Sequence, residues 1–380
     1  MSHVVVAPDK FKGTLTAAQA AAHLSAGLER ARPGLTVVRR PVADGGDGTV
    51  DAAVAAGFVR VEVDVTGPTG ETVRAAYAVG GGTVGGSTAV IESAQAVGLG
   101  RLPGGVPAPL SAGSRGVGEL ILAAARQGVS AIVLGLGGVA CTDGGSGLVS
   151  ALGARLLDES GAELAPGGAA LARLDRLDLS GLADLGGLQV VAATDVDNPL
   201  LGERGAATVY GPQKGATPAD VTCLERGLAR WADVAERALG RPARDRPGAG
   251  AAGGLGFAAL AFLGATMRPG IEVMLGLHSF ADQLAGARLV ITGEGALDEQ
   301  TLHGKAPAGV ARAAAAYAPG VPVIAVAGTC SLTAAQLRSA GFAGAYALTD
   351  IEPDPARCRE LAGPLLEQLA ARVAGDWLPG

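Results

Sequence analysis

The most constraining feature of this chain is a pattern that recurs near both of its ends: a short apolar segment, a loop rich in Gly and Asp, and then a helical pattern. Residues 287–309 show it most fully. Leu289–Ile291 is a short apolar run bounded by turn residues, which predicts a buried strand, and Pro307 lies where a helix can begin. In α/β proteins this order places the loop side chains at the carboxyl end of a parallel sheet, where ligands usually bind. One such loop alone is more simply explained as a solvated connection, so the interpretation depends on the repetition.

Five segments of this kind, two near the N-terminus and three near the C-terminus, predict the strands of one sheet. Two of the helices that follow begin with the form of a capping box, at Thr16–Gln19 and Thr333–Gln336. Two strand–helix units followed much later by three more are enough for a small doubly wound parallel sheet. The predicted strands are residues 3–7, 36–42, 288–291, 321–327 and 343–348.

The residues between the two groups of strands follow a different pattern, so we expect a second domain inserted into the first. At 380 residues the chain is long enough for two domains. We expect an α/β fold in which residues 1–60 and 285–380 form a discontinuous doubly wound domain, and residues 61–284 form an inserted α/β domain with a mixed sheet. The elements predicted there are a hairpin at 58–79, strands at 88–92, 129–134 and 188–193, a hairpin from 155, and helices at 114–127, 217–240 and 251–267, with a last helix of the chain at 353–373.

Composition and charge exclude several classes of function. The 61 glycines and the 3% of aromatic residues mean that small residues provide much of the packing. With 30 basic and 36 acidic residues and no basic run, the chain lacks the charge pattern of a nucleic-acid-binding protein. Its N-terminus does not resemble a signal peptide, the uncharged stretch Pro247–Met267 is mostly Gly and Ala, and the four cysteines show no metal-ligand spacing. We therefore expect a cytoplasmic protein with reduced thiols that binds neither nucleic acid nor a membrane.

Five loops that follow predicted strands together carry the side chains that phosphoryl transfer requires. Backbone N–H groups of glycine-rich loops can hold phosphate oxygens, lysine can neutralise them, and carboxylates can hold Mg²⁺ or take the proton of an attacking hydroxyl. The loops are residues 9–13, 44–49, 135–147, 195–198 and 293–305. Their acids are Asp9, Asp44, Asp47, Asp143, Asp195, Asp197, Glu294 and Asp298, and their lysines are Lys10, Lys12 and Lys305.

The sequence lacks one well-known nucleotide-binding motif and contains a match to a second. The Walker A pattern G-x-x-x-x-G-K-[ST] does not occur in the sequence, which excludes a P-loop kinase as a pattern match. Gly135-x-Gly137-x-x-Ala140 follows a predicted strand and matches the dinucleotide-binding pattern, with Asp158 about twenty residues further on. The next residues, TDGGSG, are more typical of a second phosphate or substrate loop than of a continuing Rossmann helix.

Six segments, taken together, are far more specific than any single motif. They are Ala7–Leu15 (APDKFKGTL), Pro41–Val50 (PVADGGDGTV), Leu136–Gly147 (LGGVACTDGGSG), Ala193–Gly202 (ATDVDNPLLG), Tyr210–Gly215 (YGPQKG) and Ile291–Pro307 (ITGEGALDEQTLHGKAP). In their sequences and in their order along the chain they resemble the bacterial glycerate kinase type I family, and the resemblance covers nearly the whole chain. The resemblance implies ATP-dependent phosphorylation of D-glycerate, most simply at the 2-hydroxyl to give 2-phosphoglycerate. It also implies a flavodoxin-like domain with a second α/β domain inserted into it and the active site in the cleft between them.

The roles of individual residues leave alternatives open. Asp195 is favoured as general base because it leaves a strand into an irregular segment, but Asp195 or Asp197 could instead cap the turn before Pro199. For Asp44 and Asp47 the alternative role is to form an Asx turn, and for the glycines it is to allow close packing. For Lys10 and Lys12 the alternative is a solvated charge, and for His303 it is a hydrogen bond to the backbone. The full assignment is Asp9, Lys12 and Asp195 as catalytic; Lys10, Asp44, Asp47 and Arg115 as substrate-binding; Gly137, Gly138, Asp143, Gly144, Gly145 and Lys305 as cofactor-binding; and Glu294 and Asp298 as ligands of Mg²⁺, directly or through water.

Three functions from different classes are consistent with these residues. The first is a glycerate kinase that uses ATP and Mg²⁺, the second a nucleotide-dependent dehydrogenase of a small hydroxy acid, and the third a non-catalytic sensor of a sugar acid or nucleotide. The density of carboxylates near a phosphate site argues against the sensor. The sequence leaves open whether the 2- or the 3-hydroxyl is phosphorylated, and whether the protein forms a homodimer.

Overall fold

The computed structural model describes residues 2–11, 13–81, 86–277, 279–302 and 305–378, which form two compact units. Unit 1 contains residues 1–44, 51–57 and 269–380, and unit 2 contains residues 45–50 and 58–268. These limits differ from the expected boundaries of 60 and 285. Residues 269–284 belong to unit 1 because their two helices, α9 (Gly270–Leu277) and α10 (Phe280–Leu284), pack against α12 (Ala306–Tyr317) of that unit.

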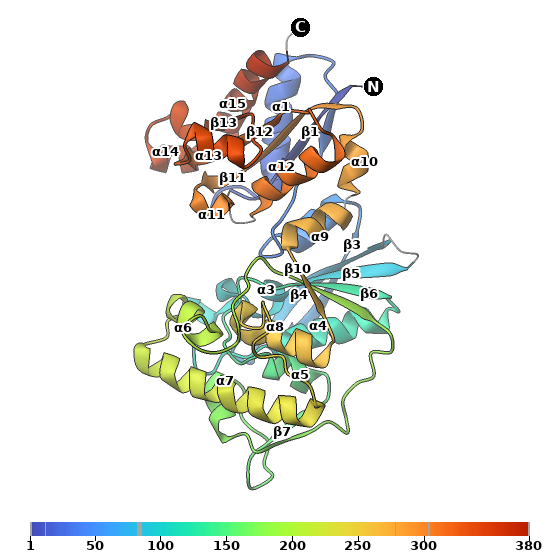
Figure 1. The fold of residues 1–380 in the computed structure, drawn as a ribbon, viewed down its shortest axis with the longest axis vertical. Coiled ribbons are helices and arrows are strands. Elements are labelled where there is room, and N and C mark those ends of the chain that lie inside the picture. Colours follow the sequence, from blue (N-terminus) through green and yellow to red (C-terminus); the bar gives the residue numbers. More distant parts are fainter. Residues whose placement is uncertain (1, 12, 82–85, 278, 303–304, 379–380) are drawn as a thin grey trace. The chain divides into compact units, whose positions relative to one another are not determined.

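Unit 1 contains a five-stranded sheet in which every pair of neighbouring strands is parallel (Figure 1). Its order, β2-β1-β11-β12-β13, is the order 2-1-3-4-5 of the flavodoxin-like fold when the strands of this unit are numbered along the chain. The expected flavodoxin-like domain is therefore confirmed. The strands are β1 (His3–Pro8), β2 (Val37–Arg39), β11 (Ala287–Leu297), β12 (Val323–Cys330) and β13 (Gly344–Ala347).

Helices cover both faces of this sheet because successive strand residues point to opposite sides. Val4 and Val6 pack with the helices α1 (Ala17–Ala31) and α15 (Ala362–Trp377), whereas Val5 and Ala7 pack with residues of α9, α10 and α12. The capping boxes predicted for Thr16 and Thr333 are both present. The remaining helices of this part of the chain are α2 (Thr49–Ala55), α11 (Glu299–Leu302), α13 (Ala334–Ser339), the short 3-10 turn η5 (Leu348–Asp350) and α14 (Pro355–Glu360).

Unit 2 contains a six-stranded mixed sheet of order β10-β9-β6-β5-β4-β3. The hairpin β3–β4 and the pair β4–β5 are antiparallel, and the pairs from β5 to β10 are parallel, so the expected mixed sheet is confirmed. A separate two-stranded ribbon joins β7 to β8. The strands are β3 (Val59–Thr66), β4 (Thr72–Gly81), β5 (Ser87–Glu92), β6 (Ala131–Gly135), β7 (Arg155–Leu157), β8 (Arg176–Asp178), β9 (Gln189–Ala193) and β10 (Thr266–Arg268).

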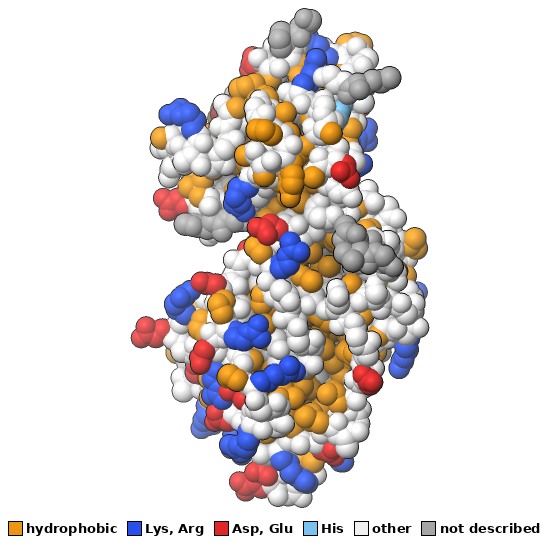
Figure 2. All heavy atoms as spheres, turned by 45° about the vertical axis from the view of Figure 1, so that its right-hand side comes forward, with side chains coloured by type: hydrophobic (Ala, Val, Ile, Leu, Met, Phe, Trp, Pro, Cys, Tyr) orange, Lys and Arg blue, Asp and Glu red, His pale blue; other side chains and the backbone are white. Residues whose placement is uncertain are grey.

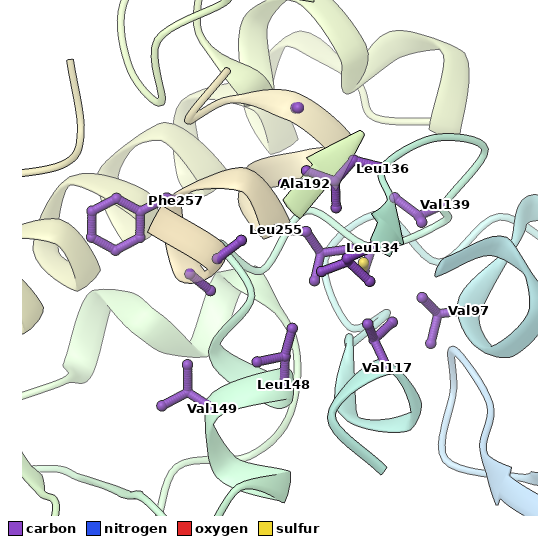
Figure 3. Close-up of a cluster of buried hydrophobic side chains, with 14 of the residues drawn as sticks. Val97, Val117, Leu134, Leu136, Val139, Leu148, Val149, Ala192, Leu255 and Phe257 are labelled. Carbon is purple, nitrogen blue, oxygen red and sulfur yellow. The ribbon is translucent and has the colours of Figure 1, made fainter. Parts of the chain in front are cut away.

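One hydrophobic core joins this sheet to its helices. Figure 3 shows side chains of β6, α4 and α8, such as Leu134, Val117 and Leu255, meeting in this core. Trp231 is fully buried, stacks on Phe262 at a ring-centroid distance of 5.5 Å and meets Phe257 edge-on at 6.1 Å. The helical elements are α3 (Ser93–Val97), α4 (Arg115–Arg126), α5 (Ser146–Ala151), α6 (Ala206–Tyr210), the 3-10 turn η4 (Pro212–Lys214), α7 (Pro218–Leu239) and α8 (Ala251–Phe262).

Two expected helices are wrong in part. The helix predicted over 251–267 ends at Phe262, and Thr266–Arg268 form strand β10, because their backbone pairs with β9 in the sheet. The last helix predicted over 353–373 is two helices, α14 and α15, which meet at Leu361. None of the helices in the described part of the chain is long and apolar enough to span a membrane. On the face shown in Figure 2, Lys and Arg side chains lie among Asp and Glu.

Candidate active site

The first group of predicted site residues lies in unit 1, where the strand order of its sheet reverses. β1 and β11 are neighbours at this point, and the carboxyl ends of such strands are the usual ligand-binding position of an open α/β sheet. Asp9 directly follows β1, and its backbone N–H donates to the carbonyl of Gly293 on β11 at 2.8 Å. Its side chain is only 5% exposed. The sheet itself therefore holds this carboxyl group in place.

Burial raises the pKa of Asp9 to about 7. The charge of Lys10 opposes this shift, as does the backbone N–H of Lys10, which donates to Asp9 Oδ1 at 2.6 Å. Asp44 and Glu294 raise the pKa further, and Lys10 Nζ lies 4.0 Å from Asp44 Oδ1. Asp9, Lys10, Asp44 and Glu294 thus form one electrostatic cluster. A carboxyl group whose pKa lies near neutral pH is a candidate for a functional site.

Glu294 and Asp298 share one lysine. Lys305 Nζ lies 3.5 Å from Glu294 Oε2 and 3.7 Å from Asp298 Oδ1. Thr301 Oγ1 donates to Glu294 Oε1 at 2.6 Å, and burial raises the pKa of Glu294. The two carboxylates expected to hold Mg²⁺ therefore lie together, with the ammonium group of Lys305 within ion-pair distance of both.

The donor chemistry of this pair suits Mg²⁺, which prefers carboxylate oxygens and keeps several water ligands. Within the described ranges, no group of three or more His, Cys, Asp or Glu side chains is arranged to hold a metal ion. A magnesium ion at Glu294 and Asp298 would therefore take the rest of its ligands from water or from a bound phosphate.

Three loops converge in unit 2. A Cβ atom built on Gly137 would lie 3.0 Å from Gly46 Cα, and one built on Gly138 would collide with the Asp47 side chain. The loop that contains Gly46 and Asp47 also contacts β9, since a Cβ built on Gly45 would lie 3.0 Å from the carbonyl oxygen of Ala193, the last residue of β9. Residues 45–48 therefore lie against the ends of β6 and β9, and the glycines make this close approach possible.

Asp143 supports the loop that follows β6 from the inside. The side chain is fully buried and accepts hydrogen bonds from the backbone N–H groups of Ser114, Gly145 and Gly147 at 2.9 to 3.1 Å, and from Ser114 Oγ at 2.8 Å. Its oxygens are therefore directed into the protein, and any part it takes in cofactor binding is through the loop that it holds.

Gly144 and Gly145 have φ values of +65° and +75°, which favour glycine. A Cβ on Gly144 would lie 2.5 Å from Trp231 Cδ1, and one on Gly145 would collide with Ala258. Trp231 Nε1 also donates to the carbonyl of Gly144 at 2.9 Å. For these two glycines the structure favours close packing, the alternative to a phosphate cradle.

Asp195 and Asp197 follow β9, and both are exposed. Asp197 Oδ1 pairs with Arg204 Nη2 at 2.7 Å, while Asn198 Nδ2 donates to the carbonyl of Arg204. Arg115 begins α4, half exposed, with its Nε 3.1 Å from Glu119 Oε1, and its backbone lies beside Gly147. Asp195 lies at the carboxyl end of β9. The neighbouring strand, β6, leads into the glycine-rich loop, so the two are at the same edge of the sheet.

The structure divides the predicted site residues between the two units. Lys12 and His303 lie outside the described residues. Unit 1 brings together Asp9, Lys10, Asp44, Glu294, Asp298 and Lys305, and unit 2 contains Asp47, Arg115, Gly137, Gly138, Asp143, Gly144, Gly145 and Asp195.

Sequence reasoning gave no role to two buried charges beside these loops. Glu92, at the end of β5, accepts hydrogen bonds from the backbone N–H groups of Gly48 and Val50 at 3.1 and 3.2 Å, so it holds the loop that carries Asp47. Lys214 donates to the carbonyl of Cys141 at 2.5 Å and to Thr142 Oγ1 at 3.3 Å. The only sequence signal for Lys214 was its place in the segment YGPQKG, since the partners are some seventy residues away in the chain.

The dinucleotide-binding pattern at Gly135–Ala140 is not a Rossmann fingerprint. A helix should begin within such a pattern, but the next helix, α5, begins at Ser146. Asp158, the candidate ribose ligand, lies in the exposed turn after β7, where it accepts from the backbone N–H groups of Ser160 and Ala162. The geometry gives no support to the dehydrogenase alternative.

We expect Asp9 to make unit 1 less stable as the pH rises. The folded state, with a pKa of about 7 against an ordinary 3.8, binds more protons than the unfolded state between these values, so the free energy of unfolding falls as the pH increases through this window. Asp9→Asn lacks this titration. It should therefore exceed the native protein in stability at pH 8, by on the order of a few kcal/mol, and by much less at pH 4.

Urea unfolding followed by ¹⁹F NMR of protein labelled with 5-fluorotryptophan measures this effect, because the two tryptophans, Trp377 and Trp231, report on units 1 and 2 separately. Glu367→Gln is the matched control in unit 1. Hydrogen bonds from His23 and Arg30 lower the pKa of Glu367, so its loss should destabilise at pH 8 and matter less as the pH falls towards 4. Equal pH dependence of Asp9→Asn and the native protein would contradict the assignment.

Comparison with known proteins agrees with this architecture. The chain matches the model of the glycerate kinase family over residues 4–378. It is 47% identical over 330 residues to a glycerate kinase of Bacillus subtilis (strain 168), covering 86% of this chain and 85% of that one. It is 44% identical over 329 residues to glycerate 2-kinase of Escherichia coli (strain K12), covering 86% and 85%. A crystal structure with the description "putative glycerate kinase 2 from Salmonella typhimurium LT2" superposes with a TM-score of 0.84 at 40% identity, covering 99% of this chain and 98% of that one.

The fold and these similarities define the chain as an enzyme of the phosphotransferase class. More narrowly, the chain belongs to the glycerate kinase family, as the resemblance of the six segments implied.

Proposed function

We propose that this protein transfers the γ-phosphoryl group of Mg-ATP to the 2-hydroxyl of D-glycerate in the cytoplasm, giving ADP and 2-phosphoglycerate. The observation that carries the proposal is the family match over residues 4–378. The name of the relative in Escherichia coli, glycerate 2-kinase, supports the 2-hydroxyl.

In this reaction the 2-hydroxyl oxygen attacks the γ-phosphorus, the bond from phosphorus to the oxygen shared with the β-phosphate breaks, and ADP leaves with that electron pair. The hydroxyl proton goes to a carboxylate, for which we propose Asp195. It is exposed at the end of β9, beside the loops that carry Gly137 and Asp47, so a substrate can reach it.

Negative charge on the reactants would be balanced by the lysines of unit 1 and by a Mg²⁺ ion that its carboxylates would hold. Lys10 is assigned to the carboxylate of glycerate and Lys305 to a phosphate, because each is a partly exposed cation beside the carboxyl end of β1 or β11. Mg²⁺, when bound, neutralises the phosphate oxygens. Glu294 and Asp298 would hold it through oxygen ligands and water once the ammonium group of Lys305 contacts phosphate instead of these carboxylates.

The remaining assignments divide between substrate and nucleotide. Asp44, Asp47 and Arg115 are proposed for glycerate, its hydroxyls facing the aspartates and its carboxylate contacting the guanidinium of Arg115 as well as Lys10. Gly137 and Gly138 offer backbone N–H groups for phosphate oxygens, on the loop that Asp143, Gly144 and Gly145 support. Asp9, whose pKa lies near 7, can hold or release a proton at neutral pH beside Lys10. Lys12 is kept as a catalytic candidate on its place in the sequence.

A coupled assay of ADP release tests the proposal. Release should depend jointly on Mg-ATP and D-glycerate, and ³¹P NMR of the product should show 2-phosphoglycerate. No release above the background with ATP alone would overturn the kinase assignment, and a 3-phosphoglycerate product would overturn only the assigned hydroxyl. L-glycerate, assayed in parallel, measures the stereochemical preference.

A further inference from the structure

A short segment of unit 2 connects the two loops to which the nucleotide and the general base are assigned. We call residues 206–215, which comprise α6 and η4, the linking segment. The glycine loop is residues 136–145 after β6, and the acid loop is residues 194–199 after β9. β6 and β9 are neighbouring parallel strands, so both loops leave the same edge of the sheet.

The linking segment reaches each loop through one polar side chain. Tyr210 Oη donates to Asn198 Oδ1 of the acid loop at 2.7 Å. Lys214 Nζ donates to the carbonyl of Cys141 and to Thr142 Oγ1 of the glycine loop. Only three residues separate the two side chains in the chain, and 3-10 turn η4 fixes their spacing.

The burial of Lys214 is costly, which indicates that its contacts are specific. The side chain is 4% exposed, and burial lowers its pKa, while the charge of Asp143 in the glycine loop opposes this shift. Buried charges are tolerated only when they are paired and hydrogen-bonded. An apolar side chain of similar length could fill the space without that cost, so packing alone does not account for a lysine here.

A second connection between the same loops is made by the backbone of the turn that begins α8. The N–H of Gly250 donates to the carbonyl of Asn198 at 2.9 Å, and the N–H of Gly144 donates to the carbonyl of Gly253 at 3.0 Å. Ala252 in this turn has a φ of 51°, which an alanine rarely adopts, and Gly253 and Gly254 also have positive φ values. The structure thus maintains an unfavourable backbone conformation where the two loops are joined.

We propose that the linking segment sets the position of the acid loop relative to the glycine loop, and that Tyr210 and Lys214 are positioning residues for phosphoryl transfer. The proposal rests on the proposed function, since it assumes that Asp195 takes a proton from a hydroxyl that attacks a phosphate held by the glycine loop. Neither residue is assigned any contact with substrate. A shift of about 1 Å between the two loops would suffice to lower the rate strongly.

The kinetic test uses Tyr210→Phe, Lys214→Met and the double variant. Each single variant should lower kcat about tenfold, with a change in KM for D-glycerate of less than about threefold. The double variant should lower kcat by far less than the hundredfold product, because either substitution releases the same connection. Tyr346→Phe is the matched control in unit 1, since Tyr346 Oη also donates to a side-chain oxygen, Oδ2 of Asp376, at 2.7 Å. It should leave kcat unchanged.

Hydrogen exchange gives a readout that does not depend on activity. In each single variant, amide exchange should increase in peptides covering both the glycine loop and the acid loop, while peptides of β5 stay protected. Faster exchange confined to the loop that the altered residue contacts would overturn the proposal, as would a fully multiplicative loss of kcat in the double variant. If the native protein showed no glycerate-dependent ADP release, the proposed function would fail, yet the exchange pattern would still decide on the linking segment.

Discussion

Asp195→Asn is expected to lower kcat for glycerate phosphorylation by about 10² to 10⁴, the usual contribution of a positioned general base. Asn has the same shape as Asp but cannot take the hydroxyl proton, so the substrate should still bind while turnover is lost. Steady-state ADP release measures kcat, and isothermal titration calorimetry with an ATP analogue measures nucleotide binding, which should change little.

Asp197→Asn is the matched control, because it makes the same change two residues away on the same acid loop. Asp197 pairs with Arg204, but their side chains are 74% and 67% exposed, so the pair should contribute little to stability. We expect a change in kcat of less than about twofold. The opposite outcome, in which Asp197→Asn is inactive and Asp195→Asn active, would reverse the assignment of the base and make Asp195 the turn cap that the sequence left open.

Much of the fold followed from local pattern, because strand–loop–helix units are defined by nearby residues. The five strands of unit 1 and the two capping threonines, Thr16 and Thr333, are where the sequence placed them. Strand lengths were harder to predict, because pairing with distant partners sets them. β11 continues to Leu297, past the glycines on both sides of Glu294, because its backbone pairs with β12 as far as Cys330. The glycine at 293 allows close approach to Val326, and it does not mark a turn.

The candidate site was predictable in its residue types but not in its internal support. Aspartates and lysines after predicted strands are visible in the sequence. That Asp9 and Glu294 lie beside each other follows from the pairing of β1 with β11, which local pattern does not reveal. The burial of Asp143, Glu92 and Lys214 depends on partners between 2 and 73 residues away. Periodicity carries no information about such contacts, because a buried charge is specified by all the polar groups that surround it in the fold, and only some of these are its neighbours in the chain.

Asp143→Asn is expected to destabilise unit 2 by about 3 to 5 kcal/mol, the loss that follows when one partner of a buried charged network is removed. The substitution leaves no cavity, so the effect is electrostatic. The donors of Ser114 and Gly147 both point at Asp143 Oδ2, and an amide nitrogen in that position would face donors with another donor. If the introduced amide turned by 180°, its nitrogen would face the backbone N–H of Gly145, which is also a donor.

The ¹⁹F resonance of Trp231 should report this loss directly, because the indole donates to Gly144, the next residue. In urea its unfolding transition should move to lower concentration, while the transition of Trp377 in unit 1 stays in place. Asp158→Asn is the matched control: that carboxylate also accepts backbone N–H groups, but it is partly exposed to water, and its substitution should shift the transition far less. Lys214→Met in the Asp143→Asn background separates charge from geometry. If the uncompensated ammonium group accounts for much of the loss, the double variant should be more stable than Asp143→Asn alone; if it is less stable by the full effect of Lys214→Met, the two buried charges act independently.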